Sequence, residues 1–172
     1  MKKLFTLILM ITMALSIETS GVQAVEVANI TGLKYRITEV QFQRIDATTV
    51  RLRFRAWGTG DWNGDGEVKS GHLTINQGFD LLIDNSSGNR EISGRTVGQI
   101  VIDVIGAGFK FKGSVDGLMP GQDSTHGEFQ LAVKAAARRG RELNLDIEGV
   151  YNRLTNKIRR MTGSGFMFTG DA

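Results

Sequence analysis

The clearest group of residues that could do chemistry is a short run of oxygen-bearing side chains. Asp61, Asn63 and Asp65 alternate with other residues, and Gly66 and Glu67 follow directly. Ca²⁺ takes about six to eight hard oxygen ligands, and a glycine after the third side-chain ligand lets the chain turn sharply around the ion. We therefore predict a calcium site formed by Asp61, Asn63, Asp65 and Glu67, the last through its carbonyl or its carboxylate.

This stretch resembles EF-hand calcium loops, and more closely the single loops of dockerins and extracellular β-repeat proteins, over about 12 residues. It departs from them at two positions. Lys69 stands where an acid is common, and His72 stands where the family places a bidentate carboxylate. The resemblance implies weak binding, with a Kd of about 10⁻⁴–10⁻³ M. Asp, Asn and Gly also favour turns without a metal, so a plain turn remains the alternative.

Arginines gather in two clusters. Three alternate along one face of a predicted strand: Arg51, Arg53 and Arg55. We expect them to be solvated and paired with Glu39 and neighbouring acids. Three others crowd a predicted turn: Arg138, Arg139 and Arg141. Fewer acids lie near this turn in the sequence, and the guanidinium group suits bidentate recognition of oxyanions. We predict a surface for an anion or a partner there.

The sequence offers no convincing catalytic set. Asp123, Ser124 and His126 are close together, but a working triad needs the histidine between an acid and a nucleophile beside an oxyanion hole. Neighbouring loop residues rarely achieve that geometry. The chain has no cysteine, so it has neither a cysteine nucleophile nor a thiolate metal site. We expect a non-enzymatic protein, with a hydrolase built from spatially assembled carboxylates as the less favoured alternative.

The first 24 residues have the three parts of a secretory signal. Lys2 and Lys3 are followed by the apolar stretch 4–17, and the segment 22–24 ends in small-x-small at Ala24. We therefore predict cleavage before Val25 and a periplasmic or secreted protein. Nothing downstream has the roughly 20 apolar residues of a transmembrane helix, so we expect no membrane segment in the mature chain.

Residues 25–172 are predicted to form a single all-β domain. The 21 basic and 18 acidic residues of the whole chain become 19 and 17 after the loss of Lys2, Lys3 and Glu18, a net charge of +2. This balance, with the export signal, argues against nucleic acid as a partner. Glycines punctuate short apolar runs, which favours an antiparallel β-sandwich of about 8–10 short strands, with a closed β-barrel as the alternative.

The best-defined element is a hairpin between residues 39 and 56. Apolar and polar residues alternate on both arms, and pairing Ile45 with Thr49 places Phe42 opposite Leu52, Val40 opposite Phe54 and Glu39 opposite Arg55. The alternation changes phase between Ile37 and Val40, which predicts a bulge.

Other elements are less sharply defined. The run 100–105 is apolar on both faces except at Asp103, which predicts a central strand covered on both sides. The 138–141 turn can close a hairpin in which Val133 faces Leu143. Residues 150–161 fit either a helix or a hairpin, and the hairpin suits the surrounding β pattern better.

These features favour an exported binding or assembly module for an envelope or extracellular protein or a glycan. Trp57 and Trp62 could form an aromatic sugar-contact surface, although one tryptophan in the core and one at its edge is the simpler arrangement. The alternative is a β-barrel carrier of an apolar ligand or lipid, for which strands apolar on both faces would line a cavity. The sequence does not identify the ligand.

Overall fold

The computed structural model describes residues 27–64, 69–87, 90–119, 126–152, 154–155 and 157–168. These residues form eight strands: β1 (Val27–Arg44), β2 (Thr49–Gly64), β3 (Gly71–Asp84), β4 (Arg90–Ile102), β5 (Ala107–Met119), β6 (His126–Ala137), β7 (Glu142–Asn152) and β8 (Lys157–Phe168). A short 3₁₀ turn, η1 (Asp103–Ile105), joins β4 to β5. Within the described ranges there is no helix with the length and apolar character needed to cross a membrane.

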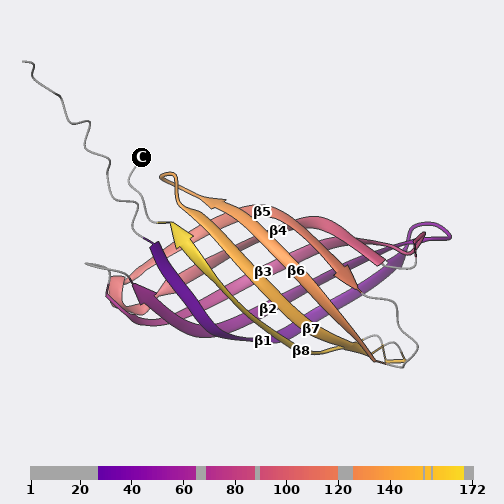
Figure 1. The fold of residues 1–172 in the computed structure, drawn as a ribbon, viewed down its shortest axis with the longest axis horizontal. Coiled ribbons are helices and arrows are strands. Elements are labelled where there is room, and N and C mark those ends of the chain that lie inside the picture. Colours follow the sequence, from indigo (N-terminus) through magenta and orange to yellow (C-terminus); the bar gives the residue numbers. More distant parts are fainter. Residues whose placement is uncertain are drawn as a thin grey trace, which may run out of the picture.

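Each strand pairs antiparallel with the next, and β8 returns to pair with β1, so the sheet closes into a barrel with obliquely running strands (Figure 1). The all-β prediction is confirmed, and the barrel alternative is the architecture found, in place of the expected sandwich. Both architectures need strands that alternate between a buried and an exposed face. In this protein the strands form one continuous sheet, which the pairing of β1 with β8 closes. The strands are also longer than expected, from 11 to 18 residues.

The predicted β1–β2 hairpin is confirmed over its closed end. Phe42 pairs with Leu52 and Gln41 with Arg53, and the expected bulge lies between Thr38 and Gln41. Because the bulge absorbs residues 39 and 40, Thr38 takes the place opposite Arg55 that was predicted for Glu39. Glu39 and Val40 together oppose the single residue Phe54, and the φ of Glu39, 55° in the left-handed region, lets β1 take up this one extra residue.

Two other strand predictions need correction. The stretch 100–105 is not one covered strand: β4 ends at Ile102, η1 follows, and Val101, Val104 and Ile105 are exposed. Gly106, with a φ of 58°, reverses the chain there and ends the strand early.

In the β6–β7 hairpin, Val133 faces Leu145 rather than Leu143. The centre of the hairpin lies one residue later than expected, at Arg139, where Arg139 and Gly140 both adopt positive φ. A shift of two residues keeps every side chain on its predicted face. The hairpin expected within 150–161 is confirmed, with β7 pairing with β8.

The barrel interior holds the hydrophobic core, which alternate residues of all eight strands supply. Trp62, at the end remote from the β1–β2 turn, is 1% exposed, whereas Trp57 points outward and is 56% exposed. This is the simpler of the two tryptophan arrangements predicted. Near the middle, Tyr35 donates a hydrogen bond to Gln77 Oε1 at 3.3 Å, and burial raises the pKa of Tyr35.

Candidate ligand cavity

A cavity of about 370 Å³ opens at one end of the barrel. The turns after β1, β3, β5 and β7 all lie at this end, because the strands run alternately up and down. Every strand contributes to the lining: Phe42, Arg44, Val50, Leu52, Phe54, Leu81, Ile83, Asn85, Arg90, Ile92, Met119, Phe129, Leu131, Tyr151 and Ile158. The walls are therefore mostly aliphatic and aromatic, with polar groups toward the rim, as in binding sites for small apolar molecules.

The cavity lies where the barrel is closed least completely. β1 pairs with β8 from Val27 to Tyr35, opposite Phe168 to Met161, and among the described residues this ladder goes no further. Beyond it, Phe42 and Tyr151 meet across the gap with ring centroids 5.7 Å apart. The strands thus separate at this end, and the space between them is lined by apolar side chains instead of being filled by them.

At the opposite end of the barrel the inward-facing side chains pack into the hydrophobic core. Side chains there are almost fully buried: Ile30, Trp62, Leu73, Ile102, Leu143, Leu145 and Met167 are each 2% exposed or less. Between the two ends, the rings of Phe54 and Phe79 stack with centroids 4.6 Å apart. Phe54 also lines the cavity, so this stack forms part of its floor.

The rim is braced by hydrogen bonds between two turns. Arg44 Nε donates to the carbonyl of Asp46 at 3.0 Å, and Nη2 donates to that of Ala47 at 3.4 Å. Asn85, after β3, donates from both its backbone N–H and its Nδ2 to the carbonyl of Thr48, at 2.8 and 2.9 Å. The β1–β2 turn is therefore tied to the end of β3, which fixes one side of the opening.

Arg90 occupies the cavity wall at the start of β4. Its Nη1 contacts Met119 Sδ at 3.7 Å. Alternate residues of a strand point to the same side, so Arg90 faces inward like Ile92, and Arg44 faces inward like Phe42. Each arginine is thus the last inward-facing residue at its strand end.

The predicted calcium ligands divide between described and undescribed residues. Asp61 and Asn63 lie on the outer face of β2, where Asp61 Oδ1 is 2.9 Å from His72 Nδ1 and Asn63 Nδ2 donates to Thr31 Oγ1 at 3.0 Å. Asp65 and Glu67 lie outside the described residues. In the described part of the chain, no three His, Asp or Glu side chains are placed to hold a metal. The calcium site stays a prediction.

The predicted anion surface of Arg138, Arg139 and Arg141 lies on the β6–β7 turn, at the end of the barrel opposite the cavity. Arg141 is held over the ring of Phe109, with its Cζ 4.5 Å from the ring centroid. The structure does not bring these arginines together with the cavity. Their role in binding an anion or a partner stays a prediction.

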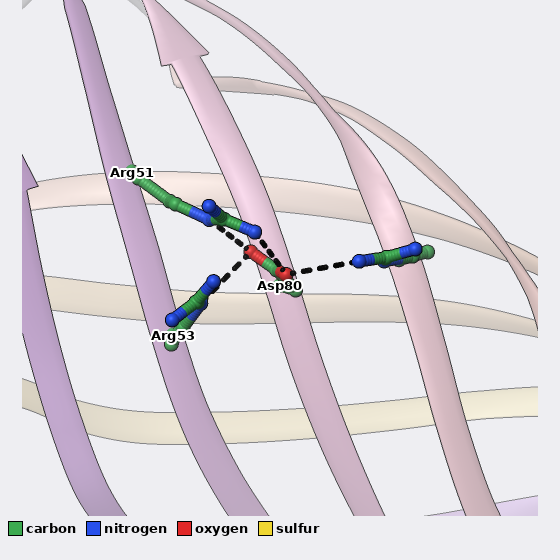
Figure 2. A network of polar contacts seen from close by, with 4 residues as sticks. Arg51, Arg53 and Asp80 are labelled. Carbon is green, nitrogen blue, oxygen red and sulfur yellow. Dashed lines mark hydrogen bonds and ion pairs between the residues drawn. The ribbon is translucent and has the colours of Figure 1, made fainter. Parts of the chain in front are cut away.

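The arginines of β2 are paired with acids, as expected from the sequence. Asp80 accepts hydrogen bonds from Arg51 at 2.7 and 2.6 Å, and it lies 3.4 Å from Arg53 and 3.6 Å from Arg95 (Figure 2). The hydrogen bond from Arg51 is the main reason that the pKa of Asp80 falls from 3.8 to about 2. Arg55 lies 3.4 Å from Glu39.

The remaining catalytic candidates gain no support. His126 begins β6, opposite Asn152. Its side chain, with Asp123 and Ser124, lies outside the described residues.

Sequence reasoning did not find Arg44 or Arg90, although a signal exists. Arg44 lies two residues after Phe42, and Arg90 lies two residues before Ile92, so each shares the inward-facing side of its strand with apolar residues. Each arginine therefore places a charge at the end of an apolar face. A charged residue in that position is expected at the mouth of an interior space, but only the closed topology shows that the two strand ends share one mouth.

The fold and the cavity define the molecule as an up-and-down, eight-stranded antiparallel β-barrel with an apolar chamber at one end. No protein-family model, curated protein or solved structure matches the chain.

Proposed function

We propose that this protein is a non-enzymatic carrier that binds an apolar small molecule or lipid inside its barrel. The observation that carries the proposal is the apolar cavity of about 370 Å³, which opens at one barrel end. Its volume lies within the range of about 300–1,000 Å³ typical of small-molecule sites. Of the functions predicted from the sequence, the carrier gains most from this geometry, because the chamber is built by all eight strands.

The burial of apolar ligand surface would supply the affinity. Removing apolar surface from water contributes about 25 cal/mol per Å². Leu52, Leu81 and Ile83 present such surface on neighbouring strands, and Leu131 presents it from β6. A ligand that enters between them would replace water against these side chains.

A neutral fluorescent probe, N-phenyl-1-naphthylamine, tests the proposal directly. We expect its emission to rise on mixing with residues 25–172, and expect solvent extraction of the purified protein to yield an apolar molecule. Val50→Trp, at the half-buried mouth, should abolish the rise by filling the entrance. Leu118→Trp is the matched control, because Leu118 lies at the same end on the outer face and is 47% exposed.

An unchanged probe response in a folded Val50→Trp protein would contradict the proposal, as would no response in the wild type. Should Val50→Trp fail to fold, Ile92→Phe fills the same cavity with a smaller increase in volume.

Export to the periplasm or medium is part of the same proposal, and the signal-like residues 1–24 support it. Expression of the full chain in a bacterial host, followed by fractionation and N-terminal sequencing, would test it. We expect the protein outside the cytoplasm with Val25 as its first residue. A cytoplasmic protein that retains residues 1–24 would contradict it.

Binding to an envelope glycan or protein is the second candidate function. Exposed Trp57 favours it, since its indole lies on the outer face in a shallow hollow with Lys34, Arg36 and Arg55. Aromatic and arginine side chains are enriched where proteins bind partners. Pull-down on envelope glycan with wild type and Trp57→Ala would test it: equal retention of the two proteins would exclude this surface.

A further inference from the structure

The geometry points to an anionic amphiphile as the ligand class of the cavity. Its apolar chain lies among the barrel side chains, and its carboxylate or phosphate meets Arg44 and Arg90 at the rim. This inference rests on the proposed carrier function and adds the chemistry of the head group.

The cavity wall, as far as the structure describes it, carries positive charge. Among the described residues of its wall, Arg44 and Arg90 are the charged ones, and both are cationic. An opposite charge placed beside an apolar wall is attracted more strongly than in bulk water, because the local dielectric constant is lower. An ammonium head group would be repelled at the same place, and a hydroxyl would gain only ordinary hydrogen bonds.

The β1–β2 turn holds the side chain of Arg44 in one position at the rim. Its two hydrogen bonds to the carbonyls of Asp46 and Ala47 fix the guanidinium at the rim. A guanidinium has five N–H donors, so these two bonds leave others for ligand oxygens. Because the group is already held in place, less rotamer freedom is lost on binding.

The carboxylate nearest to Arg44 in sequence is occupied elsewhere. Asp46 Oδ1 accepts hydrogen bonds from the backbone N–H groups of Thr48 and Thr49, at 2.9 and 2.8 Å. Asp46 therefore stabilises the turn and meets Arg44 through its backbone carbonyl rather than through its side chain. The Asp46 carboxylate therefore does not neutralise the guanidinium of Arg44, which lines the cavity at its opening.

The head group can be tested apart from the chain with ligands that share one alkyl tail. Dodecanoate, dodecyl phosphate, 1-dodecanol and dodecylamine would each displace N-phenyl-1-naphthylamine from the wild-type protein. We expect at least one anion to bind about tenfold more tightly than the alcohol, as a charge-assisted hydrogen bond implies. We expect the amine to bind most weakly. The two anions distinguish a carboxylate ligand from a phosphate ligand.

Arg44→Gln and Arg90→Gln should each remove most of the anion's advantage while leaving the affinity for 1-dodecanol within about twofold. Arg138→Gln, on the turn at the other barrel end, is the control and should change neither affinity. Thermal melting would confirm that each variant is folded. If Arg90→Gln does not fold, the result for Arg44→Gln alone decides the test.

Equal affinities of the anions and the alcohol for the wild type would overturn the inference and leave the carrier function standing. If neither the probe nor any of the four ligands bound to the wild-type protein, the carrier function would be overturned as well. Retention of the full anion preference in both folded arginine variants would also overturn the assignment of the head group to this rim.

Discussion

Asp80 of β3 accepts two hydrogen bonds from the guanidinium of Arg51 on β2, at 2.7 and 2.6 Å. Arg53 and Arg95 approach the same carboxylate at 3.4 and 3.6 Å. One carboxylate is therefore in contact with three cations on the outer face of the barrel, across three neighbouring strands (Figure 2). The cluster depends on Asp80, because its removal leaves three positive charges side by side.

We expect Asp80→Asn to lower the free energy of unfolding by about 1 kcal/mol at neutral pH. The hydrogen bonds from Arg51 lower the pKa of Asp80 from 3.8 to about 2 in the folded protein. The stabilisation is therefore complete above pH 3.8 and is lost as the pH falls through about 2. Urea denaturation of both proteins at several pH values from about 2 to 7 would measure this loss of stability.

The difference between the wild-type and Asp80→Asn curves isolates this carboxylate from the others. That difference should shrink as the pH falls from about 4 to about 2. Asp116→Asn, which changes an exposed carboxylate on β5, is the matched control and should give a difference that is small throughout. A constant gap between wild type and Asp80→Asn across this range would contradict the argument.

Phe129 and Gly149 face each other across β6 and β7, inside the barrel. A Cβ at position 149 would overlap the Phe129 ring, so the glycine makes room for the aromatic side chain. We expect Gly149→Ala to cost about 1–3 kcal/mol of stability because the ring must move. Chemical denaturation would give the value.

Phe129→Leu provides the second arm of a double-mutant cycle. In that background the Gly149→Ala penalty should fall, because the smaller side chain leaves room for a methyl group. Gly78→Ala is the control within a strand, since a Cβ there would meet only Val97 atoms at 3.7 and 3.9 Å. If the effects of the two substitutions on stability were additive, the Phe129 ring would not be the reason that position 149 requires glycine.

The sequence predicted elements that local alternation determines. The register of Phe42 with Leu52 follows from matching two alternating faces around one turn, and the phase change before Val40 marks the bulge. The run 100–105 was misread because composition alone does not show where a glycine turn begins. Closure through β1 and β8 joins the two ends of the described sheet, which no local pattern encodes.

The cavity was harder to predict than the fold, for a physical reason. Leu52 and Leu145 are both buried and both alternate with outward-facing residues, yet Leu52 lines the cavity and Leu145 packs into the core at the other end of the barrel. Whether an apolar face meets another side chain or empty space depends on the separation of distant strands. Local alternation therefore predicts a carrier only as an alternative, and it does not show that Arg44 and Arg90 line one cavity, because the two residues lie on strands that are distant in the sequence.

Calcium binding at residues 61–67 is the remaining prediction from the sequence. Asp61 contacts His72 at 2.9 Å on the outer face of β2, so a metal that used this carboxylate would compete with the histidine. We expect weak binding, with a Kd of about 10⁻⁴–10⁻³ M. Calorimetric titration of residues 25–172 with Ca²⁺ should release or absorb heat, and the melting temperature should rise.

Asp61→Ala and Asp65→Ala should each abolish both signals, because each removes an oxygen ligand of the predicted loop. Asp146→Ala, on the outer face of β7, is the control and should leave both unchanged. His72→Ala tests whether Asp61 is a calcium ligand or only a partner of His72. If the Asp61 carboxylate is a ligand, removing the histidine that competes for it should strengthen calcium binding. With no heat and no stabilisation at about 10 mM Ca²⁺, which is above the expected Kd, the segment would be a turn between β2 and β3 without a metal.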